Sequence, residues 1–360
     1  MGVYTTIDDP SVYFQTELYS GNGSTQTVTN SGNSDLQPDW IWTKERTNTS
    51  GNQNHTWTDS SRGNTKQLFG NLTSADATSS DFITSFNTDG FGLGNNANIN
   101  NNGSNYVAWQ WKVNGGSTTS FSESGSQIGG ARQVNTTAGI SIITYTGNGS
   151  SDSTIPHGLG VTPEYVIVKN RDDSDEWVSN GSVLGNYTRL HPNADSAAAT
   201  GQGSHDYIKY PDTNATNLVT GVVHNRSNAD GDTYVAWCFA SKQGYSKLGT
   251  YVGNGESSDN AFVYTGFKPA WVMIKCTTNA EPWFINDTKR STSNPTAAAL
   301  RPESSAAENT TSGYSIDILS NGFKVRNNAG QIGADGRTHF YMAFAENPFV
   351  SSAGVPTTAR

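Results

Sequence analysis

Tyr19-Ser20-Gly21-Asn22-Gly23-Ser24 is the first of three similar stretches from which the fold can be predicted. The same pattern returns as Tyr145-Thr146-Gly147-Asn148-Gly149-Ser150 and as Tyr251-Val252-Gly253-Asn254-Gly255. Glycine and asparagine tolerate the positive φ angles of tight hairpins, so each copy predicts a turn that follows a strand. A motif that returns at long intervals also indicates an internal repeat.

Two further markers repeat in the same order around these turns. A proline-led apolar strand that ends in lysine occupies residues 38–44, 163–169 and 269–275. A closing strand follows as Tyr106-Val107-Ala108-Trp109, Tyr234-Val235-Ala236-Trp237 and Tyr341-Met342-Ala343-Phe344. All three markers shift by 125 to 128 residues between the first and second copies, and by 106 or 107 between the second and third. This agreement predicts an internal triplication.

Each copy has the features of an antiparallel β-sandwich. Bulky residues alternate along the closing strand, as in Val107, Trp109 and Trp111, which is the period of a strand with one buried face. Short strands separated by Gly, Asn and Ser clusters are typical of two packed sheets. We therefore predict an all-β protein in which the aromatic residues fill the space between the two sheets of each sandwich.

The markers also predict domain boundaries. Three sandwiches are expected at residues 1–115, 138–244 and 245–350, with a C-terminal tail at residues 351–360. Residues 116–137 are rich in Gly, Ser and Thr and are predicted to be a linker. We expect the second and third sandwiches to share a close interface because no spacer separates them, and the first to be more loosely attached.

Composition and charge exclude several classes of protein. The chain of 360 residues carries 22 basic and 31 acidic side chains, a net charge of −9, without a basic cluster for a phosphate backbone. Nucleic-acid binding and membrane insertion are therefore not expected, and the start of the sequence does not resemble a secretory signal. Two cysteines, Cys238 and Cys276, are expected to be buried free thiols rather than a disulfide scaffold.

One polar pattern recurs in two of the three copies. Trp57-Thr58-Asp59-Ser60-Ser61-Arg62 corresponds to Ile285-Asn286-Asp287-Thr288-Lys289-Arg290, whereas residues 178–182 of the second copy lack both charges. Asp and Arg three residues apart in a turn can close an ion pair or orient a polar ligand. The structural clamp is the favoured interpretation, and the ligand site stays as the alternative.

Catalytic and metal chemistry are not indicated. A glycosidase needs two facing carboxylates, and the acidic residues here are scattered, except in Asp172-Asp173-Ser174-Asp175-Glu176. That run is interpreted as a solvated hairpin tip, with calcium binding as the alternative. The six histidines have no metal-ligand spacing, and neither a nucleophile elbow nor a phosphate-binding loop occurs. We expect no catalytic residues, no metal and no cofactor.

The tryptophans suggest a carbohydrate-binding site, because aromatic faces stack on sugar rings. Most of the nine fall on predicted strands and are assigned to the core, but Trp57, Trp177 and Trp283 lie in the next strand or its loop and are the better candidates for a ligand site. The candidate ligand-binding residues are Trp57, Asp59, Arg62, Trp177, Trp283, Asp287 and Arg290.

The sequence resembles a repeat found in structural proteins of tailed bacteriophages, many of them marine. The resemblance is carried by the Gly-Asn-Gly turns, Asp59-Ser60-Ser61-Arg62-Gly63, residues 84–91 and the ending Tyr341-Met342-Ala343-Phe344-Ala345-Glu346-Asn347-Pro348-Phe349. It implies jelly-roll, concanavalin-A-like domains and a place in the virion after synthesis in the host cytoplasm. It offers no catalytic motif, and the second copy departs from it most, since it lacks the Asp-Ser-x-Arg turn.

Three functions follow as hypotheses. The first is a non-enzymatic structural protein of a phage particle, such as a tail fibre, spike or capsid-attached appendage, which assembles with other virion proteins and with itself. The second is a carbohydrate-binding module that recognises a host-surface glycan. The third is a polysaccharide-degrading enzyme of concanavalin-like fold, which would need a cleft with two carboxylates about 5 to 9 Å apart.

Overall fold

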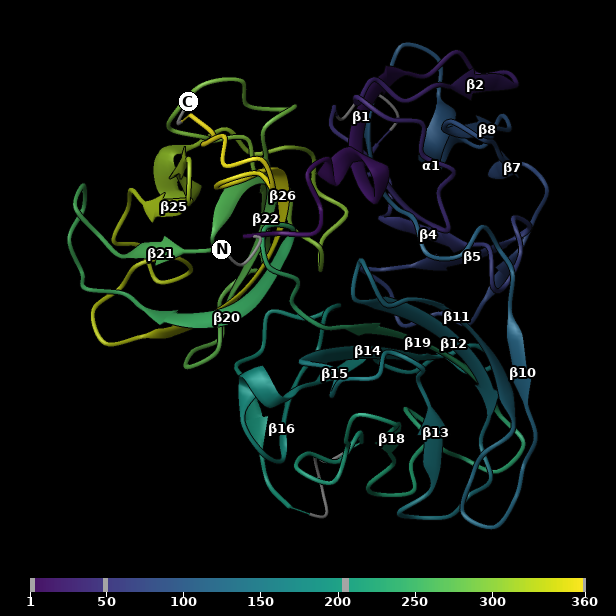
Figure 1. Cartoon of the computed structure of the whole chain (residues 1–360). Coiled ribbons are helices and arrows are strands. Elements are labelled where there is room, and N and C mark those ends of the chain that lie inside the picture. The colour runs from purple at the N-terminus through teal and green to yellow at the C-terminus, as the bar shows by residue number, and fades with distance from the viewer. Residues whose placement is uncertain (1–3, 48–50, 203–206, 359–360) are drawn as a thin grey trace.

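The computed structural model describes residues 4–47, 51–202 and 207–358 (Figure 1). Strands dominate it, as predicted, and the all-β fold is confirmed. They form three large antiparallel sheets. The first contains, in spatial order, β1 (Phe14–Ser20), β9 (Asn105–Trp111), β3 (Trp40–Glu45), β4 (Thr56–Asp59), β5 (Lys66–Phe69) and β6 (Ala77–Thr78). The second contains β10 (Thr119–Phe121), β11 (Gly130–Asn135), β12 (Ile140–Thr146), β19 (Thr233–Phe239), β14 (Tyr165–Asn170), β15 (Val178–Asn180), β16 (Thr188–Leu190) and β17 (Ala199–Thr200). The third contains β20 (Ser246–Val252), β26 (Thr338–Pro348), β22 (Phe267–Cys276) and β23 (Phe284–Asp287).

A small sheet covers one face of each large sheet. The three small sheets are β2 (Gln26–Val28), β8 (Phe91–Leu93) and β7 (Ile83–Phe86); β13 (Thr154–Pro156) and β18 (Asn217–Val219); and β21 (Phe262–Tyr264), β25 (Gly322–Val325) and β24 (Ile316–Leu319). A separate apolar core lies between the two sheets of each pair. We call each pair a unit, numbered 1 to 3 along the chain. The helical segments are short: η1 (Pro10–Val12), α1 (Ala97–Asn100), η2 (Ser182–Leu184) and η3 (Ser312–Tyr314). Within the described ranges, no helix is long and apolar enough to cross a membrane.

The three large sheets share one strand order. β1-β9-β3-β4 in unit 1 corresponds to β12-β19-β14-β15 in unit 2 and to β20-β26-β22-β23 in unit 3. In each unit the tyrosine before the Gly-Asn-Gly turn stacks on the residue directly across the sheet, with ring centroids 4.9 to 5.1 Å apart. These are equivalent positions in the three sheets. The internal triplication itself stays a prediction.

The cross-strand register corrects one sequence match. Tyr19 faces Tyr106 and Tyr145 faces Tyr234, but Tyr251 faces His339 rather than Tyr341. The third closing strand is therefore displaced by two residues from the sequence match. Because the side-chain period of a strand is two, a two-residue displacement keeps the buried face buried, so the pattern did not reveal the error.

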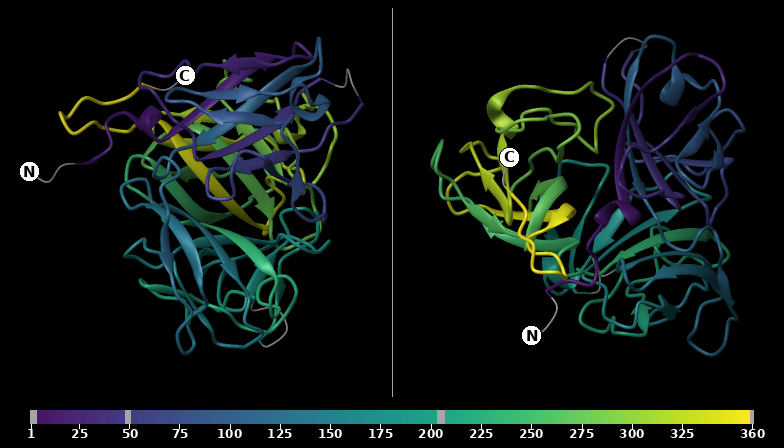
Figure 2. Two further views of the ribbon diagram at one scale, coloured as in Figure 1. Left: turned by 90° about the vertical axis from the view of Figure 1, so that its right-hand side faces the viewer. Right: turned by 45° about the horizontal axis from the view of Figure 1, so that its top comes forward.

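The face of each large sheet that its small sheet does not cover points to the centre of the molecule, and the three such faces meet there (Figure 2). Trp40 of unit 1 stacks on Trp111 at 4.1 Å and lies 5.9 Å from Trp237 of unit 2. Trp111 lies 5.8 Å from Trp271 of unit 3. The tryptophans thus fill the space between units, and not the space between the two sheets of one sandwich as predicted. The expectation that unit 1 is loosely attached is also wrong, because its tryptophans form much of this shared core.

The predicted linker at residues 116–137 is part of a sheet. It contains β10 and β11, which extend the second sheet past β12. The tail after residue 350 folds back, with the Ser352 backbone N–H donating to Asp8 Oδ1 at 2.6 Å. The segments near the two ends of the chain therefore touch.

Candidate functional site

The three tryptophans proposed for ligand binding are buried. Trp57 is 2% exposed, and Trp177 and Trp283 are fully enclosed. Trp57 and Trp177 meet edge to face at 4.7 Å, which joins units 1 and 2. Trp283, in unit 3, donates from its indole to the carbonyls of His191 and Ala194 in unit 2. The prediction that these rings stack on a sugar is corrected, since each faces the shared core and leaves no ring face accessible.

Asp59 and Arg62 form a buried joint between units 1 and 2. The Arg62 guanidinium donates to Asp59 and to Asp76 at 2.6 Å each, and its side chain is fully buried. Asp76 in turn accepts from Arg171 of unit 2 at 2.8 Å. Burial alone would lower the pKa of Arg62, but the two carboxylates raise it above the ordinary arginine value.

Asp287 and Arg290 form the corresponding joint between units 3 and 1. Arg290 donates to Asp287 at 2.5 Å and to Glu308 at 3.1 Å, and Glu308 accepts from Arg46 of unit 1 at 3.0 Å. The indole of Trp109 in unit 1 donates to Asp287 at 3.0 Å. The same arrangement of charges therefore joins the units at two of the three boundaries.

The boundary between units 2 and 3 keeps the backbone contact and lacks the charges. The Ala198 backbone N–H donates to the Thr277 carbonyl at 2.9 Å. At the other two boundaries the backbone N–H of Asp76 donates to the Arg171 carbonyl, and that of Glu308 to the Arg46 carbonyl. The loss of the Asp–Arg turn at residues 178–182 is thus matched by uncharged residues on both sides of the joint. The clamp interpretation accounts for these pairs.

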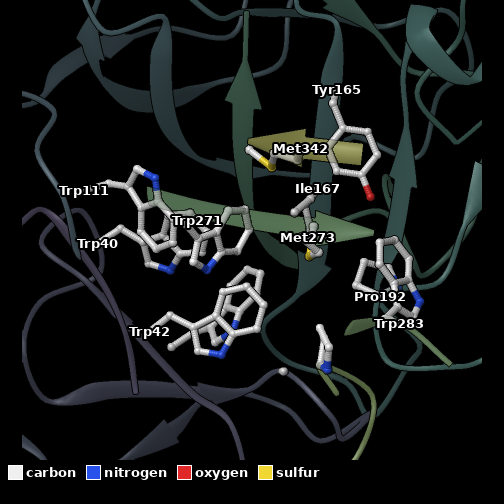
Figure 3. Close-up of a pocket in the computed structure, with 13 residues that line it drawn as sticks. Trp40, Trp42, Trp111, Tyr165, Ile167, Pro192, Trp271, Met273, Trp283 and Met342 are labelled. Atoms are coloured by element: carbon white, nitrogen blue, oxygen red, sulfur yellow. The ribbon is translucent and has the colours of Figure 1, made fainter. Parts of the chain in front are cut away.

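A small cavity lies at the centre of the aromatic core (Figure 3). Trp40, Trp42, Trp111 and Trp271 surround one side of it, and Trp283 and Pro192 the other (Figure 3). Its free space is about 10 Å³, which is about the smallest volume that can hold one water. The centre of the molecule is therefore a packed core and not a ligand chamber.

A larger groove opens between units 1 and 3, with a volume of about 390 Å³. One wall is the edge strand β1 with the loop at residues 31–33, and the other comes from the ends of β22, β23 and β26. The lining residues are Ser11, Phe14, Gln15, Thr16, Glu17, Ser31, Gly32, Asn33, Ala270, Thr288, Lys289, Ala345, Glu346 and Asn347. Sequence reasoning missed this groove, because its walls lie more than 200 residues apart in the chain.

Charged and amide groups give the groove its chemistry. Glu17 accepts from the N–H and the hydroxyl of Ser31, both at 2.7 Å. Lys289 reaches across the groove to the Ser31 hydroxyl at 2.8 Å. Glu346, on the unit 3 wall, is paired with Lys268 at 2.9 Å. The groove therefore presents a carboxylate on each wall and an ammonium between them.

A second surface pocket of about 380 Å³ is bounded by aromatic residues of unit 3 and the N-terminal segment. Tyr4 and Tyr264 approach each other to 3.3 Å between hydroxyl oxygens, and Lys247 also lines the pocket. On β21, Phe262 and Tyr264 are each about half exposed. These two rings are accessible in a way that the predicted tryptophans are not.

Carboxylates of the acidic run at residues 172–176 are bound by other residues of the same chain. Asp172 accepts from the N–H and the hydroxyl of Thr233, while Asp175 and Glu176 both pair with Arg226. In the part of the chain that the structure describes, no group of three or more His, Cys, Asp or Glu side chains is placed to hold a metal ion. Calcium binding there stays an untested alternative.

These features describe an all-β protein in which three sandwich units close around one aromatic core and leave an open groove at one boundary. The chain belongs to a family described as a domain of unknown function, DUF7483, whose model matches residues 9–348 and so spans all three units. Neither the curated proteins nor the solved structures contain a match to this chain.

Proposed function

We propose that this protein is a non-enzymatic structural component of a bacteriophage particle, such as a tail fibre, spike or capsid-attached appendage. The observation that supports this role best is the way the conspicuous side chains are used. The tryptophans and both Asp–Arg pairs hold the three units together, so they serve the rigidity of the body. A rigid body with exposed sheet edges suits assembly with other virion proteins.

Mass spectrometry of gradient-purified particles tests this role. The chain should be present at a fixed copy number relative to the major capsid protein, and antibody labelling should place it on the particle. If the chain stays in the soluble fraction of the lysate and is absent from particles, the proposal fails.

A carbohydrate-binding role is a second candidate, supported by the exposed ring of Tyr264, which lines the pocket at Tyr4, and by that of Phe262, two residues before it on β21. Accessible aromatic faces with nearby hydroxyls are suited to sugar rings. A glycan array with the wild type and a Phe262→Ser/Tyr264→Ser variant tests it. Binding that the variant loses, with unchanged thermal stability, would support a glycan site, and no binding by the wild type would rule it out.

The enzyme hypothesis can be tested at the groove, since Glu17 and Glu346 line its two walls. Glu17 is 7% exposed and already bound by Ser31. Release of reducing sugar from host-surface polysaccharide by the wild type, and its loss in Glu17→Gln, would favour an enzyme over a structural protein.

A further inference from the structure

The groove beside β1 corresponds to a position that a strand fills elsewhere in the same chain. In unit 2, β11 pairs with the outer edge of β12. β12 and β1 are equivalent strands, because Tyr145 and Tyr19 hold the same place in their sheets. Counting back from these tyrosines, residues 140–143 of β12 correspond to residues 14–17 of β1. Residues 140–143 pair with β11, and residues 14–17 line the groove.

The opposite wall of the groove shows the same correspondence. At the boundary of units 1 and 2, the amide of Gln133 on β11 lies 2.8 and 2.6 Å from the hydroxyls of Ser60 and Ser61. These serines follow Asp59, as Thr288 and Lys289 follow Asp287. Thr288 and Lys289 line the groove. β11 thus lies between β12 and the serines after Asp59, and the groove lies between their counterparts, β1 and the residues after Asp287.

The third boundary does not offer such a space. The chain passes directly from unit 2 into β20, and Ser241 accepts from the Leu248 N–H at 3.0 Å. Val183 and Leu184 of η2 pack against the central core there. Beside the equivalent strands, the boundary of units 1 and 2 thus contains β11 and that of units 2 and 3 contains η2, whereas the boundary of units 3 and 1 contains the open groove.

We propose that the groove between units 1 and 3 binds an extended segment of a partner protein, which pairs with β1 as an additional antiparallel strand. In the described residues β1 pairs with β9 alone, so its outer edge presents unpaired backbone donors and acceptors. Addition of a peptide strand to such an edge is a general mode of recognition, in which the backbone supplies affinity and alternate side chains supply specificity. The proposal deepens the assembly role proposed above and rests on it.

The groove also indicates the sequence of the segment. In β11, Arg132 faces Ile143, and Ile143 corresponds to Glu17. A basic residue in the partner would therefore face a carboxylate. The next residue of the partner would take the place of Gln133 and face Lys289, so an acidic side chain is favoured there. The expected segment is about six residues long, with a basic residue followed by an acidic one at its centre.

A synthetic peptide of residues 129–136 carrying Gln133→Glu is the probe, because it combines the strand sequence with the expected charge pattern. Its binding to the full-length protein is measured by calorimetry. Hydrogen exchange with mass spectrometry then locates the contact. We expect saturable binding and slowed exchange of the amides of β1, with no change at β12.

Two changes test the mechanism. A peptide with proline at positions 133 and 134 should bind at least about tenfold more weakly, since successive N–H groups point to opposite edges and one of the two must face β1. A Lys289→Glu protein should bind the glutamate peptide about two- to fivefold more weakly, and a peptide with Gln133→Lys should recover that loss. Lys247→Glu, which lies outside the groove, is the matched control and should leave affinity unchanged.

Several outcomes would overturn the strand site. They are the absence of binding at millimolar peptide, protection at β12 in place of β1, and binding that is insensitive to the two prolines. The test is independent of particle composition. If the chain is found in particles but does not bind the peptide, only the strand site is refuted. If the chain binds the peptide but is absent from particles, only the proposed function is refuted.

Discussion

The guanidinium of Arg62 in unit 1 lies 5.6 Å from the ring centroid of Trp237 in unit 2. Arg290 of unit 3 lies 5.5 Å from the ring of Trp109 in unit 1 in the same way. Each arginine is also bound to a buried aspartate three residues before it, so an ion pair and a cation–π contact act together at both boundaries. The positions of these arginines make the boundaries of the units sensitive to single substitutions.

Replacement of Arg62 by methionine should lower the free energy of unfolding by about 3 to 5 kcal/mol, because the fully buried Asp59 would lose its arginine partner, while Asp76 would keep Arg171. Urea denaturation followed by tryptophan fluorescence measures this. Arg171→Met is the matched control, since Arg171 is partly exposed and Asp76 keeps Arg62. That control should cost about 1 kcal/mol or less. Equal losses in the two variants would contradict the clamp.

The three units should unfold together. Since one aromatic core contains residues of all three units, loss of any unit exposes the core faces of the other two. Calorimetry should show a single transition whose calorimetric and van't Hoff enthalpies agree. Trp57→Ala should destabilise the whole chain by about 3 to 5 kcal/mol and shift that single transition. Separate transitions, with only one of them moved by the substitution, would indicate independent domains.

Buried lysines should make stability rise with pH. Burial lowers the pKa of Lys169 from 10.5 to about 8, although nearby carboxylates oppose the shift. Between pH 8 and 10.5 the unfolded chain therefore holds one proton more than the folded chain, so this lysine increases stability as the pH rises, by about 1 kcal/mol per pH unit. Lys169→Met should remove this contribution and leave those of Lys44 and Lys275, whose pKa values burial also lowers to about 8. Unfolding free energies at pH 7, 8, 9 and 10 measure it, with exposed Lys247→Met as the control. A slope in Lys169→Met equal to that of the wild type would contradict the assignment.

The two cysteines should differ in reactivity. Burial raises the pKa of Cys238 to about 12. Burial would also raise the pKa of Cys276, but the His339 side chain and the backbone N–H of Asn279 lower it to about 7. Alkylation at pH 8 in the folded state, followed by peptide mass spectrometry, should therefore modify Cys276 first. His339→Phe should slow that reaction. Equal rates at both cysteines would mean that global unfolding controls access.

Local patterns predicted the strands well and the environment of their faces poorly. The alternation at Val107, Trp109 and Trp111 correctly marked a buried face of β9. It did not show that the face covering it belongs to other units, because the period of a strand reports burial and not the identity of the covering surface. Trp57, Trp177 and Trp283 were misplaced for the same reason. The Gly- and Ser-rich stretch that contains β11 was read as a linker, since its strand is held by pairing with β12 and contacts with unit 1.

By itself the sequence determined that the chain is all-β, that turns follow Tyr19, Tyr145 and Tyr251, and that Asp59 and Asp287 pair with an arginine three residues on. These features depend on neighbours within a few residues, and side-chain periodicity and turn geometry encode them directly. Only the tertiary structure decided that the tryptophans face one shared centre, that Arg62 reaches Trp237, and that β1 has an open edge. Those features depend on which surfaces meet across more than a hundred residues of chain, and packing of the three large sheets against one another selects them.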